Sequence, residues 1–409
     1  MGSEQGMGWH WITGLARYCN LYIISEGEYR PQVEDWMADS EHKELAESMH
    51  FYWNPVSDKV RKRCWRQGNW LFYFSYEQWQ KKTEQIAYQI IEKEHIDILH
   101  QLNMTGFREP GYLWRVSKQT GIPFVWGPIG GMQQFPYKYF IDGGMGFCLF
   151  YGLKHIINSW QRKSSARVKK AIIQANLLVA ATHDTEYHVQ QSHKRNTFLI
   201  PDAGCYIQQD IKKPCSDKPV LKAIWVGKFD FRKRLDIALK SIAATNGHDI
   251  ELDVYGSGNE KQIHHTKKLI EELNIPSKVR LMGQQSHDSV QKAMQEADVM
   301  LFTSVSEGTP NAVVEAISNH LPVICFDACG MATVVDESVG RKIRFTNPKQ
   351  SVIDFANALD YFYEHRDELQ KCSDNCAEKA KLFSWDRKTE MMFHLYEEIL
   401  TEKINQKIQ

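Results

Sequence analysis

Four charged residues of this chain have types and spacings that suit chemistry on an anionic substrate. Glu307 and Glu315 lie eight residues apart in SEGTPNAVVEA (306–316), which follows an apolar run. One carboxylate can reach a sugar while the other faces a nucleoside, because carboxylates accept hydrogen bonds from hydroxyl pairs. Lys228 and Lys233 follow another apolar run and can converge on one diphosphate to neutralise a leaving nucleotide. The plainer alternatives are that Glu315 only interacts with the helix dipole, that Glu307 is an ordinary loop residue, and that the lysines belong to a solvated basic face.

The residues between the two glutamates predict an anion site. Thr309 is expected to cap a helix with Pro310 at its first position. The backbone amides of Gly308, Thr309, Asn311 and Ala312 then gather near a positive helix terminus, which suits a diphosphate.

Two further glycines are assigned to the same side of the site. Gly256 lies in VYGSGNE (254–260), a glycine turn after an apolar run and a weak signal taken alone. Gly283 opens GQQSHDS (283–289), which offers only Asp288 to the N1 and N2 donors of a guanine. Uridine is therefore favoured over guanine as the base.

Alternating elements are predicted to position these residues. From residue 219 onward, short β-branched runs alternate with helical periods, which predicts βαβ crossovers and a doubly wound α/β domain. The residues above then lie in loops beyond the carboxyl ends of parallel strands, where such sheets bind ligands. Weaker patterns predict a second domain of this kind in the first half. The predicted strands are 20–24, 96–100, 122–126, 176–180, 197–200, 223–226, 251–255, 278–282, 298–302 and 322–326.

Composition excludes several classes of protein. The chain has 409 residues, 43% of them hydrophobic and 24% charged, which indicates an ordered globular protein of two or three domains. Lys plus Arg and Asp plus Glu both number 50, so no long-range field favours nucleic acid. The scattered cysteines show no zinc spacing, and no two aspartates have the Asp-x-Asp spacing of a metal-dependent transferase. We expect a cytoplasmic protein without metal or cofactor.

Taken together, 226–236, 254–260 and 306–316 resemble the retaining glycosyltransferases of family 4, which have the GT-B fold of two Rossmann-like domains. Their E-x7-E motif matches Glu307 and Glu315, and their basic pair matches Lys228 and Lys233, with lysine in place of the usual arginine at 228. The resemblance implies that the first glutamate and the loop amides hold donor sugar and phosphates, and that the second glutamate binds the ribose.

The first half resembles a narrower branch of that family through GSEQGMGW (2–9) and WGPIGG (126–131). The resemblance places a glycine turn at Gly6 and Gly8 against the donor phosphates. No strand pattern precedes that turn, so a first strand is expected to be missing, through truncation or a misplaced initiation codon. The histidine common in the family is replaced by a backbone that Gly130 and Gly131 leave open to a ligand.

Other residues of the first half are candidates of lower specificity. His100 ends a predicted strand and is an alternative catalytic group, although a strand-end histidine is more often structural. Glu4, Arg108 and Glu109 are assigned to an acceptor, and a local ion pair explains the last two equally well. The basic, partly apolar segment 147–170 predicts either a solvated helix or contact with an anionic membrane near a lipid-linked acceptor.

The domains are expected at 1–205 for the acceptor and 206–385 for the nucleotide sugar, followed by a helix at 386–409 that can pack back on the first domain. The resemblance implies a retaining, metal-independent transferase that moves a sugar from a nucleoside diphosphate to a glycan or lipid-linked hydroxyl. Two alternatives stay open: a non-catalytic sugar-nucleotide-binding subunit, and a sugar-nucleotide 2-epimerase.

Overall fold

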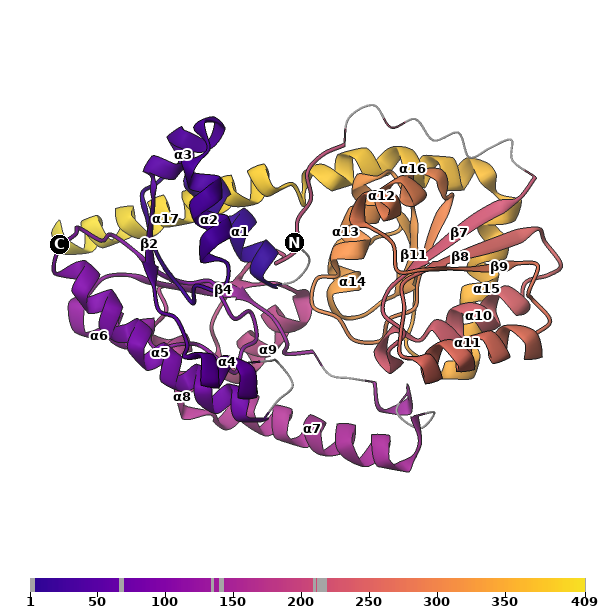
Figure 1. Ribbon diagram of the computed structural model, residues 1–409, viewed down its shortest axis with the longest axis horizontal. Coiled ribbons are helices and arrows are strands. Elements are labelled where there is room, and N and C mark those ends of the chain that lie inside the picture. The colour runs from indigo at the N-terminus through magenta and orange to yellow at the C-terminus, as the bar shows by residue number, and fades with distance from the viewer. Residues whose placement is uncertain are drawn as a thin grey trace.

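The computed structural model describes residues 4–65, 70–133, 136–139, 143–208, 211 and 219–408. Within these ranges the strands form three parallel sheets of two, four and six strands. The two smaller sheets come from the first half of the chain and the largest from the second half, and the two halves lie side by side (Figure 1). The predicted pair of α/β domains is therefore present.

The six-stranded sheet has the order β9-β8-β7-β10-β11-β12. The chain leaves β7 towards one edge and then returns to β10, next to β7, before it continues to the other edge. The boundary between β7 and β10 is thus the topological switch point, outside which doubly wound sheets bind ligands. The strands are β7 (Leu221–Val226), β8 (Ile250–Tyr255), β9 (Val279–Gly283), β10 (Val299–Phe302), β11 (Val323–Phe326) and β12 (Gly340–Ile343).

The sequence predicted five of these six strands, because buried parallel strands are continuous apolar runs. Every residue of β10 and β11 is buried. The prediction missed β12, whose four residues GRKI include two cations at the edge of the sheet.

The first half contains a four-stranded sheet, in the order β3-β4-β5-β6, and a separate pair, β1-β2. All five predicted strands are present, although β3 begins later than expected, and β2 was not predicted. The strands are β1 (Leu21–Ser25), β2 (Met49–Trp53), β3 (Leu99–Gln101), β4 (Phe124–Ile129), β5 (Leu177–Ala180) and β6 (Phe198–Leu199).

Helices connect the strands and cover the sheets. In the first half they are α1 (Glu4–Leu15), α2 (Arg30–Ala38), α3 (Lys43–Glu47), α4 (Asp58–Cys64), α5 (Trp70–Ile91), α6 (Leu113–Thr120), α7 (Met145–Ser164), α8 (Ala166–Gln174) and α9 (His183–His193), with 3₁₀ turns η1 (Ser40–His42) and η2 (Tyr137–Tyr139). In the second half they are η4 (Phe231–Lys233), α10 (Leu235–Ala243), α11 (Glu260–Glu272), α12 (His287–Glu296), α13 (Asn311–Ser318), α14 (Cys329–Val334), α15 (Pro348–Glu364), α16 (Arg366–Lys381) and α17 (Trp385–Ile408).

The last helix crosses back over the first half. In Figure 1, α17 runs from the second domain along the first. Its residues Met392 and Tyr396 share a buried apolar cluster with Trp11 and Leu15 of α1. Helix α17 therefore covers the face of the first domain that α1 also covers.

A short segment of the first half is docked on the second domain. Tyr139 of η2 is fully buried in the core of the second domain, where its ring lies 5.6 Å from Phe326 and 5.3 Å from Phe345. Its hydroxyl lies 2.5 Å from the Ser351 hydroxyl. The two domains are thus tied by a buried aromatic anchor as well as by the connecting chain.

None of the helices within the described ranges combines the length and the apolar character that a membrane crossing requires.

Candidate functional site

An ion pair lies at the switch point of the six-stranded sheet. Lys233, in η4 after β7, has its Nζ 2.8 Å from Oε1 of Glu307, in the loop after β10. Both side chains are less than a fifth exposed, at 18% and 17%. The Ser304 hydroxyl donates to the same carboxylate at 2.5 Å, and Nζ lies 5.0 Å from the centre of the Phe302 ring. The structure thus brings together two of the residues predicted from the sequence.

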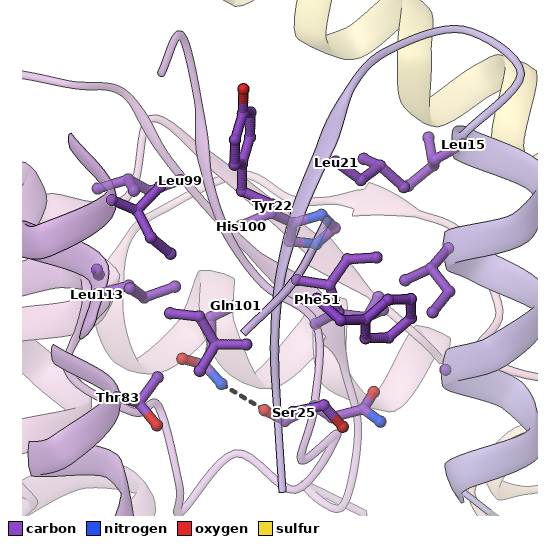
Figure 2. A pocket seen from close by; sticks show the side chains of 18 of the residues that line it. Leu15, Leu21, Tyr22, Ser25, Phe51, Thr83, Leu99, His100, Gln101 and Leu113 are labelled. Carbon is purple, nitrogen blue, oxygen red and sulfur yellow. Dashed lines mark hydrogen bonds between the residues drawn. The ribbon is translucent and has the colours of Figure 1, made fainter. Parts of the chain in front are cut away.

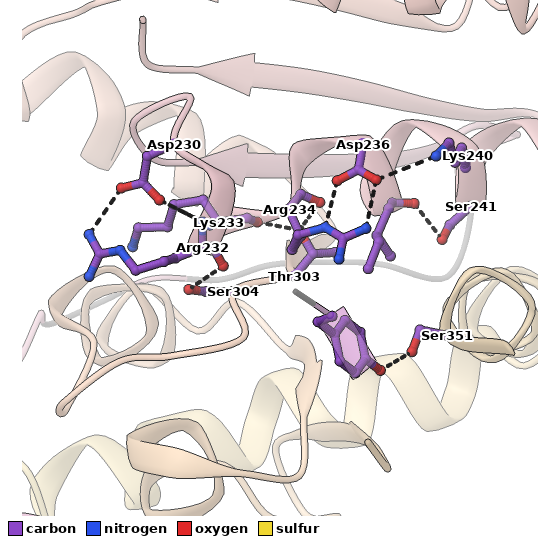
Figure 3. Close-up of polar contacts among 12 residues, drawn as sticks. Asp230, Arg232, Lys233, Arg234, Asp236, Lys240, Ser241, Thr303, Ser304 and Ser351 are labelled. Atoms are coloured by element: carbon purple, nitrogen blue, oxygen red, sulfur yellow. Dashed lines mark hydrogen bonds and ion pairs between the residues drawn. The ribbon is translucent and has the colours of Figure 1, made fainter. Parts of the chain in front are cut away.

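The turn that carries Lys233 is fixed by its own side chains (Figure 3). Oδ1 of Asp230 accepts the backbone N–H groups of Arg232 and Lys233 and so caps η4. Arg234 is 2% exposed and donates twice to Asp236, at 2.8 and 2.9 Å. Arg232 pairs with the other oxygen of Asp230 at 3.0 Å. The two arginines therefore shape the turn, while Lys233 points to Glu307.

Lys228 also follows β7, but its side chain is exposed. It stands at the strand end that carries the pair, so it offers a second cation beside Lys233. In the described chain, the ion pair with Glu307 is formed by Lys233.

The predicted cap of the helix after β10 is wrong. Helix α13 begins at Asn311, and its N-cap is Pro310, which makes no side-chain capping bond. The Thr309 hydroxyl instead donates to the Ala181 carbonyl at 3.2 Å, and the Thr309 N–H donates to the Asp202 carboxylate at 3.2 Å. One of the amides assigned to a diphosphate is therefore already used by the first domain.

The loop before α13 is in contact with the first domain along most of its length. Besides the two bonds of Thr309, the Gln133 side chain donates to the Glu307 carbonyl at 3.0 Å. Next to it, Gly308 is closely packed: a Cβ at Gly330 of α14 would lie 1.7 Å from the Gly308 carbonyl oxygen. Gln133 and Asp202 belong to no motif, so neither could be identified as a site residue from the sequence.

The second glutamate lies on α13 and faces α12. Oε1 of Glu315 lies 3.3 Å from Nε2 of His287, and Gln291 donates to Oε2 at 3.1 Å. The Glu315 side chain is 29% exposed, so part of it remains open to solvent. Glu307 and Glu315 therefore lie in separate surroundings, one paired with Lys233 and the other in contact with His287 and Gln291 of α12.

The predicted donor-side glycines of the second domain have structural reasons. Gly256 has φ +134°, and a Cβ there would lie 1.8 Å from the Gly227 carbonyl oxygen, so the end of β8 can approach β7 only with glycine. The Gly256 N–H donates to the Gly283 carbonyl at 2.8 Å. Gly283 has φ +70° and open space around it. Both glycines lie at the carboxyl edge of the sheet.

The glycine turn predicted at Gly6 and Gly8 is wrong, because both residues lie inside helix α1. Gly8 still marks a close approach, since a Cβ there would lie 2.8 Å from the Asn103 side-chain nitrogen. The described side chains do not include that of Glu4, so its acceptor assignment lies outside them.

Gly130 and Gly131 follow β4 and precede the residues that reach the second domain. The Gly130 N–H donates to the Thr105 carbonyl at 2.7 Å, and Gly131 has φ +77°. Gln133, two residues later, bonds the loop of Glu307. The backbone of this segment thus approaches the predicted donor side.

His100 lies away from that contact, inside the first domain. Its Nε2 lies 2.7 Å from the Gly127 carbonyl and its Nδ1 lies 2.5 Å from the Tyr396 hydroxyl of α17. Burial lowers the pKa of His100 to about 4, so the ring is neutral at pH 7. Both nitrogens are engaged within the first domain, so His100 ties β3 to β4 and α17.

The pair Arg108 and Glu109 is divided between two neighbours. Glu109 is 5% exposed and its carboxylate accepts from Arg167 of α8 at 2.8 Å. Burial raises the pKa of Glu109 to about 7, and Arg167 partly opposes that shift. Arg108 donates to Gln161 at 3.0 Å and lies over the Phe107 ring. Glu109 therefore forms a buried ion pair, and its partner is Arg167 of α8 rather than the neighbouring Arg108.

Known proteins resemble the two halves unequally. Residues 207–380 match the family model described as glycosyl transferases group 1. A curated relative, D-inositol 3-phosphate glycosyltransferase of Nocardia farcinica, is 25% identical over 186 residues, which cover 44% of this chain and 40% of that protein. The chain thus spans less than half of this relative's length.

Solved structures match almost the whole chain. The HepE protein of Anabaena, solved in complex with UDP, has a TM-score of 0.63 at 13% identity, over 97% of this chain and 98% of that chain. Sucrose-phosphate synthase of Thermosynechococcus elongatus has a TM-score of 0.67 at 16% identity, over 98% and 94%. The chain therefore has the GT-B fold of two Rossmann-like domains, and its second half matches the model of the glycosyl transferases group 1.

Proposed function

We propose that this protein is a retaining glycosyltransferase of family 4. It moves a hexose from a nucleoside-diphosphate sugar, UDP in preference to GDP, to a hydroxyl of a glycan or lipid-linked glycan. The observation that carries the proposal is the ion pair of Lys233 and Glu307 at the switch point of the second domain. The UDP complex of the similar HepE structure supports the choice of nucleotide.

Lys233 is the group that we assign to the leaving diphosphate. As the bond from the anomeric carbon to the phosphate oxygen breaks, its electron pair stays on the diphosphate, and a nearby cation stabilises that charge. Lys228 supplies a second cation, so the reaction proceeds without a divalent metal. Glu307, oriented by Ser304, accepts hydrogen bonds from the sugar hydroxyls.

The acceptor oxygen forms the new bond on the face from which the diphosphate leaves, and the acceptor proton passes to the departing phosphate oxygen. Glu315 holds the ribose, which donates to the part of the carboxylate that solvent reaches. The glycine backbone at Gly130 and Gly131 covers the sugar from the first domain. The contacts of Thr309 and Gln133 close the two domains and limit hydrolysis.

The direct test measures binding and turnover of UDP- and GDP-sugars in EDTA by the native chain, Lys233→Met and Glu307→Gln. We expect both variants to lose about 10²- to 10³-fold in turnover, as for loss of one group that stabilises a developing anion. Lys379→Met is the matched control: that lysine is 17% exposed, pairs with Asp336 at 2.6 Å and lies 5.9 Å from an aromatic ring centre. It should keep its activity.

Each other outcome identifies an alternative. Binding of a nucleotide sugar without any turnover would indicate a non-catalytic sugar-nucleotide-binding subunit. Interconversion of the donor without an acceptor would indicate a 2-epimerase. If no nucleotide sugar binds, or if Lys379→Met loses as much as Lys233→Met, the proposed site is wrong.

We also propose that helix α7 lies on an anionic membrane surface at the cytoplasmic face, close to a lipid-linked acceptor. Large apolar side chains recur along α7 at helical spacing and are 43–80% exposed: Met145, Leu149, Phe150, Leu153, Ile156, Ile157 and Trp160. Lys154 and Lys163 are exposed on the same helix. The predicted single basic helix is corrected, since the segment breaks at Ser165 and Arg162 is buried, donating to the Met132 carbonyl.

Vesicle binding tests this contact. Vesicles of anionic lipid should bind the native chain and release Leu153→Asp, because the charge must leave water to enter the interface. Ile173→Asp on α8, where the side chain is 64% exposed, should bind as the native chain does. Equal binding of Leu153→Asp and the native chain would contradict the proposal.

We further propose that Arg108 contacts the acceptor. We also propose that the chain divides at 205/206 into an acceptor domain and a nucleotide-sugar domain, followed by a helix at 386–409.

A further inference from the structure

A cavity separates the two sheets of the first domain. Among the described strands, β1 is hydrogen-bonded to β2 alone, and β3 is hydrogen-bonded to β4 alone. The facing edges of β1 and β3 are therefore both unpaired. Between them lies a cavity of about 1280 Å³, lined by every residue of both strands. Figure 2 shows Leu15 and Leu21 on one side of it and Leu99 and Leu113 on the other.

The second domain shows which element belongs in such a gap. Its order is β9-β8-β7-β10-β11-β12, so its first strand lies between the second and the fourth. Helix α10 leads from that first strand to the second. In the first domain, α1 leads into β1 in the same way, and the order is β2-β1, the gap, then β3-β4-β5-β6. The gap has the place of a first strand in the order 3-2-1-4-5-6 that doubly wound sheets share.

The backbone of both edges is oriented for a ladder. The Leu21 N–H donates to the Ser48 carbonyl, and the Ser25 carbonyl accepts from Asn54, so alternate residues of β1 are bonded to the β2 side. In a parallel strand the residues between them direct their backbone groups to the opposite edge. Tyr22 and Ile24 thus face the gap.

The same reasoning applies to β3. The Leu99 N–H donates to the Pro123 carbonyl on the β4 side, so the backbone of His100 faces the gap. Backbone donors and acceptors of this kind need partners when they are buried. The two edges therefore offer a pair of ladders, one on each side of the cavity.

The cavity walls above and below are mostly apolar. Helices α1 and α17 contribute Trp9, Ile12, Leu15, Phe393, Tyr396 and Leu400, and α5 contributes Phe72, Tyr76, Trp79, Ala87, Ile90 and Ile91. All five residues of β1 are only half-buried, whereas all residues of β4 and β5 are buried. An occupant that hydrogen-bonds at two edges and is apolar on both faces is a buried parallel strand.

We propose that the cavity is the seat of a further parallel β-strand of about five apolar residues, joined to the N-terminal side of Glu4. The direction agrees with α1, which begins near the carboxyl ends of the strands: Gly8 closely approaches Asn103, two residues beyond β3. A strand that runs parallel to β1 and β3 ends beside the start of α1. The proposal does not depend on the proposed enzymatic activity.

The experiment compares amide hydrogen exchange in three proteins. One is the 409-residue chain, one carries an N-terminal extension of about five Val and Ile residues with a short glycine linker, and the control carries the same extension with proline at its centre. With the apolar extension, we expect the amides of Tyr22, Ile24 and His100 to exchange at least about tenfold more slowly. The midpoint of thermal unfolding should rise as well.

The proline control should leave both quantities as in the 409-residue chain, because proline cannot donate to a ladder. Equal exchange in the two extended proteins would overturn the proposal. So would slow exchange of these amides in the 409-residue chain itself, or an apolar small molecule found in the purified chain by native mass spectrometry. These outcomes are read from exchange and mass, so a chain without transferase activity tests the proposal equally well.

Discussion

Acidification should weaken the first domain in part through the ring of His100. Its Nε2 lies at the Gly127 carbonyl, so this nitrogen carries the proton, and its Nδ1 accepts from Tyr396. Burial lowers the pKa of His100 to about 4 in the folded chain, against about 6.5 when unfolded. Between pH 6.5 and pH 4, His100 therefore binds a proton in the unfolded state but not in the folded state. The stability contribution is complete above pH 6.5 and is lost as the pH falls towards 4.

The loss can be calculated from these two pKa values. At pH 5 the difference in proton binding lowers the free energy of unfolding by about 2 kcal/mol. His100→Gln removes the titration and keeps an N–H for the Gly127 carbonyl. The stability difference between the native chain and the variant should therefore shrink by about 2 kcal/mol between pH 7 and pH 5.

Urea unfolding at pH 7, 6 and 5, followed by tryptophan fluorescence, measures this difference. Because burial also lowers the pKa of His188 to about 4, only the comparison with the variant isolates His100. An equal loss of unfolding free energy in the native chain and in His100→Gln between pH 7 and pH 5 would refute the reasoning. Sugar transfer at pH 7 gives a second readout, since a structural histidine predicts only a small change in turnover in His100→Gln, whereas a catalytic one predicts a loss of orders of magnitude.

Two further substitutions test the packing of the second domain and the buried lysine of α17. Gly256→Ala should lower the free energy of unfolding by at least about 2 kcal/mol, because Gly256 has a positive φ and an added Cβ would collide with the Gly227 carbonyl. The control is Gly152→Ala in α7, where nothing lies within 4 Å of the added Cβ, and it should not lower the free energy of unfolding. Lys388 is fully buried, and burial lowers its pKa to about 7. Between pH 7 and about 10 the unfolded state therefore binds more protons than the folded state, so the free energy of unfolding should rise with pH over that range. Lys388→Met should remove that rise in urea titrations at pH 7, 8 and 9.

The strands could be predicted because each is a local pattern. A parallel strand buried on both faces needs a continuous apolar run, and VMLF and VICF satisfy that requirement within four residues. The missed strand β2, MHFYW, is half-exposed and carries a histidine, so its run resembles a loop. Strand prediction thus succeeded at β10 and β11, where burial is complete, and failed at β2, where burial is partial.

The candidate site could be predicted only in part, because half of its contacts are not local. The eight-residue spacing of Glu307 and Glu315 is visible in the sequence. The bond from Thr309 to Ala181 spans 128 residues, and it overrides the local tendency of a threonine to cap the helix that follows. Likewise, Glu109 pairs with Arg167, 58 residues away, and not with its neighbour Arg108. No local pattern contains such partners.

These long-range contacts join the loop before α13 to Asp202 and Ala203, at the end of the first half, and to Lys388 of α17. The carboxylate of Asp202 accepts from Thr309, and the backbone carbonyls of Asp202 and Ala203 accept from Lys388, which is held over the rings of Trp11 and Trp385. A movement of the chain at Asp202 and Ala203 therefore acts directly on the loop that carries Glu307.

Among the described residues, separating the domains at this loop breaks three hydrogen bonds: Thr309 to Asp202, Thr309 to Ala181, and Gln133 to Glu307. At about 1 kcal/mol net for each bond, the direct cost is about 3 kcal/mol. A diphosphate at Lys233 can offset that amount with one or two charge-assisted bonds, which are roughly twice as strong as neutral ones. Under the proposed function, loop contacts of this size can hold the domains closed around a donor and still open to release the product.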